Sequence, residues 1–138
     1  MNNEDTKKDR LKSKGKSEFI KLIETYGGAC SIDSVHNYIN YTSDEAYQMI
    51  SDGEILSYEH NGDVRLPLFQ FEINCFEVIQ TILVRVIKST SKISQILFFL
   101  NYDQDLGMTP IEAIRTGQHS KLDLVMILAK QFQQQIAR

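Results

Sequence analysis

The sequence predicts a mainly α-helical protein with a small β-hairpin, composed of a helix-turn-helix-like N-terminal half and a C-terminal helical bundle. Three observations predict this fold. Apolar residues recur at three- and four-residue steps in several short segments that a capping residue or a glycine bounds. Strand-like alternation surrounds Asn61-Gly62, the dipeptide most typical of a tight hairpin turn. No convincing strand pattern follows Cys75, so the second half is expected to be entirely helical.

Length and composition are those of one ordinary domain or two very small ones. The 138 residues, 42% of them hydrophobic, can supply a core. The sequence has neither a long apolar run nor the pattern of a secretory signal, so we expect a cytoplasmic protein without a membrane partner. Cys30 and Cys75 lie far apart without CxxC spacing, which predicts two buried thiols rather than a disulfide framework or a zinc site.

Three short helices are predicted in the front half. The first begins at Ser17, its N-cap, and ends at the Gly27-Gly28 pair. The second begins at Ser31 and spans about ten residues. The third follows Thr42, a favourable N-cap, and ends at Gly53. A tight turn joins the last two, and such a pair is the supersecondary unit of helix-turn-helix proteins.

A hairpin follows these helices at the place where a wing would lie. Residues 54–59 and 64–69 alternate well enough to form its two strands. Pro67 lacks an N–H donor and therefore favours an edge position. We expect a two-stranded ribbon, so that a winged helix-turn-helix-like domain spans residues 17–72.

Four helices are predicted in a partner-binding or dimerisation domain over residues 73–138. They begin near Phe76, near Lys92, at Thr109-Pro110 and near Ser120, and Gly117 ends the third. Residues 76–87 and 96–100 are more apolar than a unit of this size easily hides. This excess indicates association with a second copy, as a homodimer, or with another protein.

Two stretches resemble known bacterial proteins. Residues 103–132 are similar to the toxin-binding domain of Xre/MbcA/ParS antitoxins, and residues 51–72 are similar to the segment that follows the helix-turn-helix in related small DNA-binding proteins. The matching positions of the first stretch are Leu106, Gly107, Thr109, Pro110, Ile111, Ile114 and Gly117. Those of the second are Gly53, Pro67, Phe69, Gln70 and Phe71.

The resemblance implies an antitoxin-like fold and a protein partner. Most of the matching residues can be explained by structural roles in turns, helix caps and the hydrophobic core. For Gln70 we expect a half-buried amide that ties a strand to helix backbone, and the alternative is a functional contact.

Charge is distributed unevenly along the chain. The basic residues of the first sixteen positions are Lys7, Lys8, Arg10, Lys12, Lys14 and Lys16. We expect residues 1–16 to form a disordered basic tail, with a flexible arm that contacts phosphate as the alternative. From Leu22 to Val64 there is no lysine or arginine but there are eight acidic residues.

This asymmetry bears on DNA binding. On the third helix, Ser43, Tyr47 and Gln48 could face a groove, and only Gln48 has the amide fork suited to adenine. The side chains available to contact DNA phosphates would be Arg65 on the wing and Lys12, Lys14 and Lys16 in the tail. Acidic side chains around the third helix would oppose docking.

Two hypotheses follow. The first is a small antitoxin-like or transcription-regulator-like binding protein, with a helix-turn-helix front half and a protein-docking back half. The second is an acidic protein-interaction module or inhibitor with a degenerate helix-turn-helix and no DNA binding.

No catalytic motif or metal-ligand spacing supports an enzyme, and none indicates a cofactor, a metal ion or a small-molecule substrate. The three histidines, His36, His60 and His119, are widely spaced along the sequence.

Overall fold

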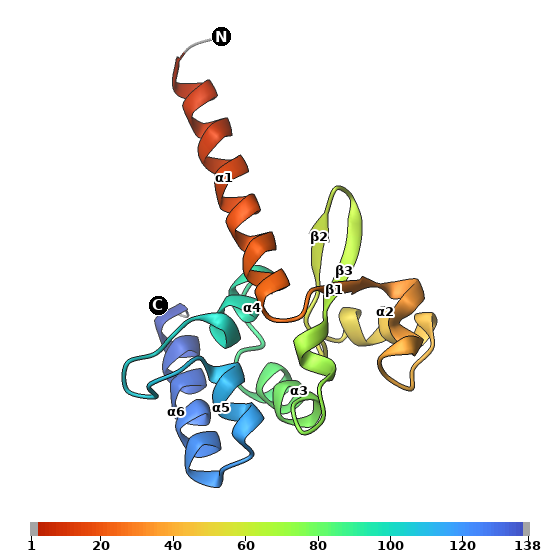
Figure 1. Cartoon of the computed structure of the whole chain (residues 1–138), viewed down its shortest axis with the longest axis vertical. Coiled ribbons are helices and arrows are strands. Elements are labelled where there is room, and N and C mark those ends of the chain that lie inside the picture. The colour runs from red at the N-terminus through yellow and green to blue at the C-terminus, as the bar shows by residue number, and fades with distance from the viewer. Residues whose placement is uncertain (1–2, 137–138) are drawn as a thin grey trace.

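A computed structural model of the chain describes residues 3–136. They form helices around one small antiparallel sheet (Figure 1). The front half contains α1 (Asn3–Thr25), β1 (Ala29–Ser31), the 3-10 helix η1 (Ile32–Asn37), α2 (Ser43–Ser51), β2 (Tyr58–His60), β3 (Asp63–Pro67) and the 3-10 helix η2 (Leu68–Phe71). The back half contains α3 (Phe76–Arg85), α4 (Lys92–Leu100), α5 (Pro110–Thr116) and α6 (His119–Ile136).

Helix α1 begins much earlier than predicted. The prediction of a disordered tail is wrong for residues 3–16, which continue the same helix as residues 17–25. Lysine, arginine, glutamate and leucine, which have high helix propensity, make up more than half of this stretch, which contains no proline and has Gly15 as its weakest position. Because Ile23 anchors the C-terminal end of α1 in the core, the helix is nucleated there and each further residue adds a hydrogen bond.

The sheet has three strands in the order β1-β3-β2, where a two-stranded ribbon was predicted. Strand β1 lies in the connection between the first two predicted helices, and the predicted second helix, which begins after Ser31 as expected, is shortened to the 3-10 helix η1. Ala29 of β1 pairs with Pro67 at the end of β3, so Pro67 lies in the central strand rather than at an edge. As the last residue of that strand, Pro67 interrupts little of the hydrogen-bonded ladder.

The hairpin itself is confirmed. Strands β2 and β3 pair in antiparallel register, and Asn61 and Gly62 between them both adopt positive φ, 53° and 82°. Two such residues are what the tightest hairpin turn requires. The elements of the front half therefore follow the order helix, strand, two helical segments and hairpin. The hairpin has the position of a wing beside the helix pair.

Both halves of the chain share one hydrophobic core. Its buried side chains include Ile23 and Leu56 from the front half and Ile82, Phe99 and Ile114 from the back half. A second, smaller core around Val35, Ala46, Met49 and Leu66 holds η1 and α2 against the sheet. The segments 17–72 and 73–138 are therefore packed together without a division of the larger core between them.

The apolar segments that suggested association lie mostly inside this core. Ile79, Ile82 and Leu83 of α3 and Ile96 and Phe99 of α4 are all buried. The intramolecular packing of α3, α4 and α5 hides the surface that was expected to need a partner. No helix in the described part of the chain is long and apolar enough to cross a membrane.

The predicted helix boundaries of the back half are confirmed at α5. The Thr109 side chain accepts a hydrogen bond from the Glu112 N–H at 3.2 Å, and Pro110 occupies the first turn. Gly117 ends the helix in the left-handed region at φ 68°, a conformation that glycine adopts without steric cost.

Candidate nucleic-acid interface

Helix α2 is the candidate recognition helix, and its own sequence fixes which residues it exposes. Thr42 and Glu45 form a reciprocal capping box at its N-terminus, and Ala46 and Met49 anchor it in the smaller core. Tyr47 is 56% exposed. Ser43 is half-buried, and its hydroxyl donates to the Ile32 carbonyl at 3.4 Å. Ser43 is thus turned toward η1.

Gln48, the one residue suited to adenine, already has a partner. Its Nε2 donates to Asp52 Oδ1 at 3.0 Å along the same helix face. Glu45, Asp52 and Glu54 line the shallow hollow beside it. An approaching phosphate would meet these carboxylates, so this face opposes nucleic acid.

Tyr47 and Arg65 are brought together on another side of α2. They line one hollow between α2, η1 and the sheet, and Asp33 and Asp63 line it too. Arg65 is half-buried. Burial of Tyr58 raises the pKa of its hydroxyl, and the positive charge of Arg65 partly offsets this increase. With two carboxylates in the same hollow, the positive charge of Arg65 is largely balanced there.

Cations gather instead on α1. Lys7, Arg10, Lys14 and Lys21 are all exposed and recur at steps of three, four and seven residues, which places them on one face of the helix. Lys12 and Lys16 are exposed as well, and Lys16 lies at the side of the helix that faces the wing, next to His60 and Asn61. The basic face of α1 is defined here as Lys7, Arg10, Lys14 and Lys21; the exposed carboxylate of Glu18 lies on the same face, four residues after Lys14 and three before Lys21.

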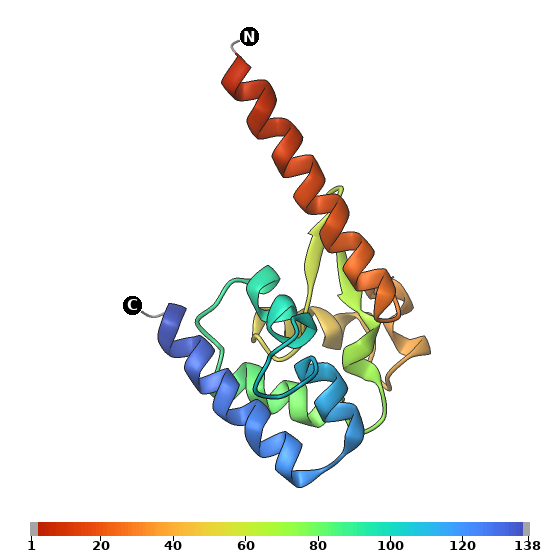
Figure 2. The same cartoon turned by 60° about the vertical axis from the view of Figure 1, so that its left-hand side comes forward.

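The structure separates the predicted DNA-contact residues into two groups. Figures 1 and 2 show α1 projecting from the body of the protein in the same general direction as the wing, whereas α2 lies at the base of the sheet. Lys12, Lys14 and Lys16 therefore do not extend the surface of α2. They belong to a second surface, formed by α1 with the wing beside it.

Three of the five resemblance positions in residues 51–72, Pro67, Phe69 and Gln70, are buried, whereas Phe71 is half-buried and Gly53 is exposed. Gln70 is completely buried rather than half-buried. Its amide accepts from Leu56 N at 2.8 Å and donates to Leu56 O at 2.9 Å and to Pro67 O at 3.0 Å. It therefore fastens the segment before β2 to the end of β3, and Phe69 beside it is also buried.

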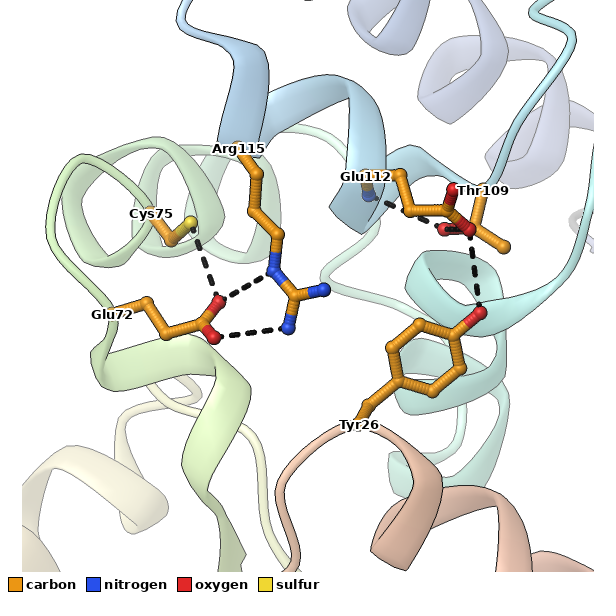
Figure 3. Close-up of polar contacts among 6 residues, drawn as sticks. All are labelled: Tyr26, Glu72, Cys75, Thr109, Glu112 and Arg115. Atoms are coloured by element: carbon orange, nitrogen blue, oxygen red, sulfur yellow. Dashed lines mark hydrogen bonds and ion pairs between the residues drawn. The ribbon is translucent and has the colours of Figure 1, made fainter.

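Several polar residues that the sequence analysis missed connect the two halves (Figure 3). Arg115 of α5 binds Glu72 through two hydrogen bonds and lies over the Tyr26 ring at 5.8 Å. The Tyr26 hydroxyl donates to Glu112 at 3.4 Å. These partners are 43 and 86 positions apart in the chain, and no local pattern could have paired them.

A shallow apolar groove of about 340 Å³ lies between α3 and α6. Val78, Leu122 and Met126 line it and are half-buried. Ile127 of α6 is 50% exposed. This is a surface in the back half on which a protein could pack.

Among the side chains that the structure describes, histidine, cysteine and acidic residues do not cluster as metal ligands. No known protein family matches the chain, and neither a curated protein nor a solved structure matches it.

Proposed function

We propose that the protein is a small regulator-like binding protein that holds nucleic-acid phosphates against the basic face of α1, and that α2 does not enter a groove. The observation that supports this proposal is the separation of charge. Exposed cations line α1, whereas α2 exposes carboxylates and an amide that is bound to Asp52. Phosphate contacts supply most non-specific affinity for nucleic acid, and they require cations.

The dimensions of α1 suit such a contact. Lys7 and Lys21 are fourteen residues apart, which corresponds to about 21 Å along the helix axis at roughly 1.5 Å per residue. This length matches roughly six base-pair steps of about 3.4 Å each along one strand. The positive end of the helix dipole lies at the N-terminus of α1 and adds to the attraction.

Charge-neutralising variants test this proposal. We expect the Lys7→Gln, Arg10→Gln, Lys14→Gln triple variant to bind random-sequence duplex DNA at least about tenfold more weakly than the wild type at low salt. The matched control is the triple variant Arg85→Gln, Lys88→Gln, Lys92→Gln, which removes the same charge from exposed positions of the back half. Fluorescence anisotropy measures both, and we expect the control to stay within about threefold of the wild type.

Either of two outcomes would favour the acidic interaction module instead. One is a wild-type protein that does not bind duplex DNA even at low salt. The other is an equal loss of affinity in both triple variants, since this would show a response to net charge rather than to the basic face of α1.

Docking of a second copy of the chain is a second candidate function, favoured by the groove between α3 and α6. Glu77 of α3 lines it, and on α6 the exposed Asp123 follows Leu122 and the exposed Lys130 lies one turn after Met126, so both signs of charge occur near it. In a two-fold contact this face of one molecule packs against the same face of a second molecule. Positive and negative side chains on the face can then pair across the contact. The resemblance of residues 103–132 to an antitoxin domain also supports a protein-docking role for this half.

Light scattering at concentrations on the order of tens of micromolar tests this second candidate. We expect a dimer for the wild type and a monomer for Thr81→Lys, because Thr81 is exposed and lines the groove, so that a lysine there would be desolvated in the contact. Ile136→Lys, at an exposed position near the end of α6, is the matched control and should remain dimeric. A monomeric wild-type protein would contradict the proposal.

A further inference from the structure

A hollow of about 390 Å³ opens between α1, the wing and the start of α4. Its apolar walls are Phe19 and Ile20 of α1, Tyr58 of β2 and Ile93 of α4. Three separate elements thus contribute apolar surface to one concave space. Its size falls within the range of about 300–1,000 Å³ that is usual for small-molecule sites.

The hollow exists because α1 and the wing diverge above one aromatic contact. The Phe19 ring packs edge-on against Tyr58, with centroids 5.2 Å apart and planes at 85°, and closes the base. One helical turn earlier, Gly15 lines the space without a side chain, and a Cβ atom placed there would meet nothing within 4 Å. The glycine leaves the space unfilled.

Polar groups surround this apolar base. Lys16, His60 and Asn61 line the hollow, together with the acidic residue Glu59. Lys16 is exposed, and no residue of the described chain forms an ion pair with it. An apolar base with an ammonium group at its margin suits a ligand that is apolar at one end and negatively charged at the other.

We propose that this hollow binds an amphipathic organic anion, with an aromatic or aliphatic body and one carboxylate or sulfonate group. The body packs on Phe19, Ile20 and Ile93, and the anionic group accepts hydrogen bonds from Lys16 and Asn61. This inference is independent of nucleic-acid binding, because it rests on the shape and chemistry of the hollow alone. A neutral ligand, or an apolar side chain of another protein, is the competing occupant.

Titration with anilinonaphthalene sulfonate tests the site. This probe has an aromatic body and one sulfonate, and its fluorescence rises when it enters an apolar space. We expect saturable binding to the wild type and binding weaker by about tenfold or more to Gly15→Leu, because the new side chain occupies the hollow. Leucine also favours a helix over glycine, so this variant should melt no lower than the wild type. Ser17→Leu adds the same side chain at an exposed position outside the hollow, and we expect it to bind as the wild type does.

Lys16→Gln tests the charge of the ligand. We expect it to weaken binding of the sulfonate probe roughly fivefold and to leave binding of the neutral N-phenylnaphthylamine unchanged. Absence of wild-type binding overturns the proposal, as does binding that Gly15→Leu leaves unchanged. Equal effects of Lys16→Gln on the two probes would show that the occupant is neutral, which also contradicts the anionic site.

Discussion

Glu72 and Arg115 form a two-pronged ion pair that joins the end of η2 to α5. Arg115 Nε donates to Glu72 Oε2 at 2.8 Å, and a second guanidinium nitrogen donates to Oε1 at 2.9 Å. The hydrogen bond to Glu72 raises the pKa of Arg115. Because Glu72 is the last residue of the winged half and α5 belongs to the helical half, this pair connects the two halves at the surface of their shared core.

We expect Arg115→Lys to be less stable than the wild type. A lysine cannot reproduce the planar pair of hydrogen bonds or the stacking on Tyr26. Both side chains are more than one-third exposed, so screening by water limits the loss in free energy of unfolding to about 0.5–1 kcal/mol. Urea denaturation measures it, and a double-mutant cycle with Glu72→Gln isolates the coupling. A coupling energy of zero would show that the pair contributes nothing.

Substitution of Gln70 should lower the free energy of unfolding far more than substitution of Arg115 does. Gln70→Leu keeps a buried side chain of similar size but leaves the N–H and C=O of Leu56 without their partners. Each unsatisfied buried group costs about 1–3 kcal/mol, so we expect a loss of roughly 3 kcal/mol or more in the free energy of unfolding. Gln70→Glu can still accept from Leu56 N but cannot donate, and it should also be destabilised. A Gln70→Leu variant as stable as the wild type would contradict the assigned role of the amide.

Stability should fall at alkaline pH because of Cys75. Burial, and after it the Glu72 carboxylate, raises the pKa of Cys75 to about 11. In the unfolded chain the thiol loses its proton near its ordinary pKa of about 8.5. Between these two values the folded state binds more protons than the unfolded state, so the free energy of unfolding decreases as pH rises.

Urea denaturation of the wild type and of Cys75→Ala between about pH 8 and pH 11 measures this contribution. The alanine variant should lose less stability over this window, although a cavity lowers its stability at every pH. Parallel curves for the two proteins would show that the Cys75 thiol titrates alike in the folded and unfolded states.

The exposed face of α2 should contribute little to the affinity for DNA. We expect Gln48→Ala to bind duplex DNA within about twofold of the wild type, because its amide is held by Asp52 and surrounded by carboxylates. A bidentate contact to adenine is worth about 1–3 kcal/mol, so a loss of more than about tenfold would show that α2 does enter a groove.

Local patterns in the sequence predicted much of the fold. The α5 helix was located correctly because Thr109-Pro110 and Gly117 act on their immediate neighbours. Asn61-Gly62 located the hairpin for the same reason. Each of these signals depends on backbone preferences over a few residues, and these preferences persist in the folded protein.

The parts that were missed depend on distant contacts. Strand β1 has three residues and pairs with β3 more than thirty positions later, so no local pattern distinguished it from the connection between two predicted helices. The extension of α1 was missed because charge indicated disorder, while helix propensity and an anchored C-terminal end favoured a helix. The hollow beside Gly15 and the Glu72–Arg115 pair arise only when separate elements come together.

The dependence of DNA binding on salt tests most directly the central claim that α1 contacts phosphates. Release of counterions makes the logarithm of the binding constant fall linearly with the logarithm of salt concentration, with a slope of about −0.9 for each phosphate neutralised. We predict a wild-type slope of roughly −3 to −5 on a random-sequence duplex, reduced in magnitude by about 2 to 3 in the Lys7→Gln, Arg10→Gln, Lys14→Gln variant. A wild-type slope that this variant leaves unchanged, or no binding at low salt, would contradict the account.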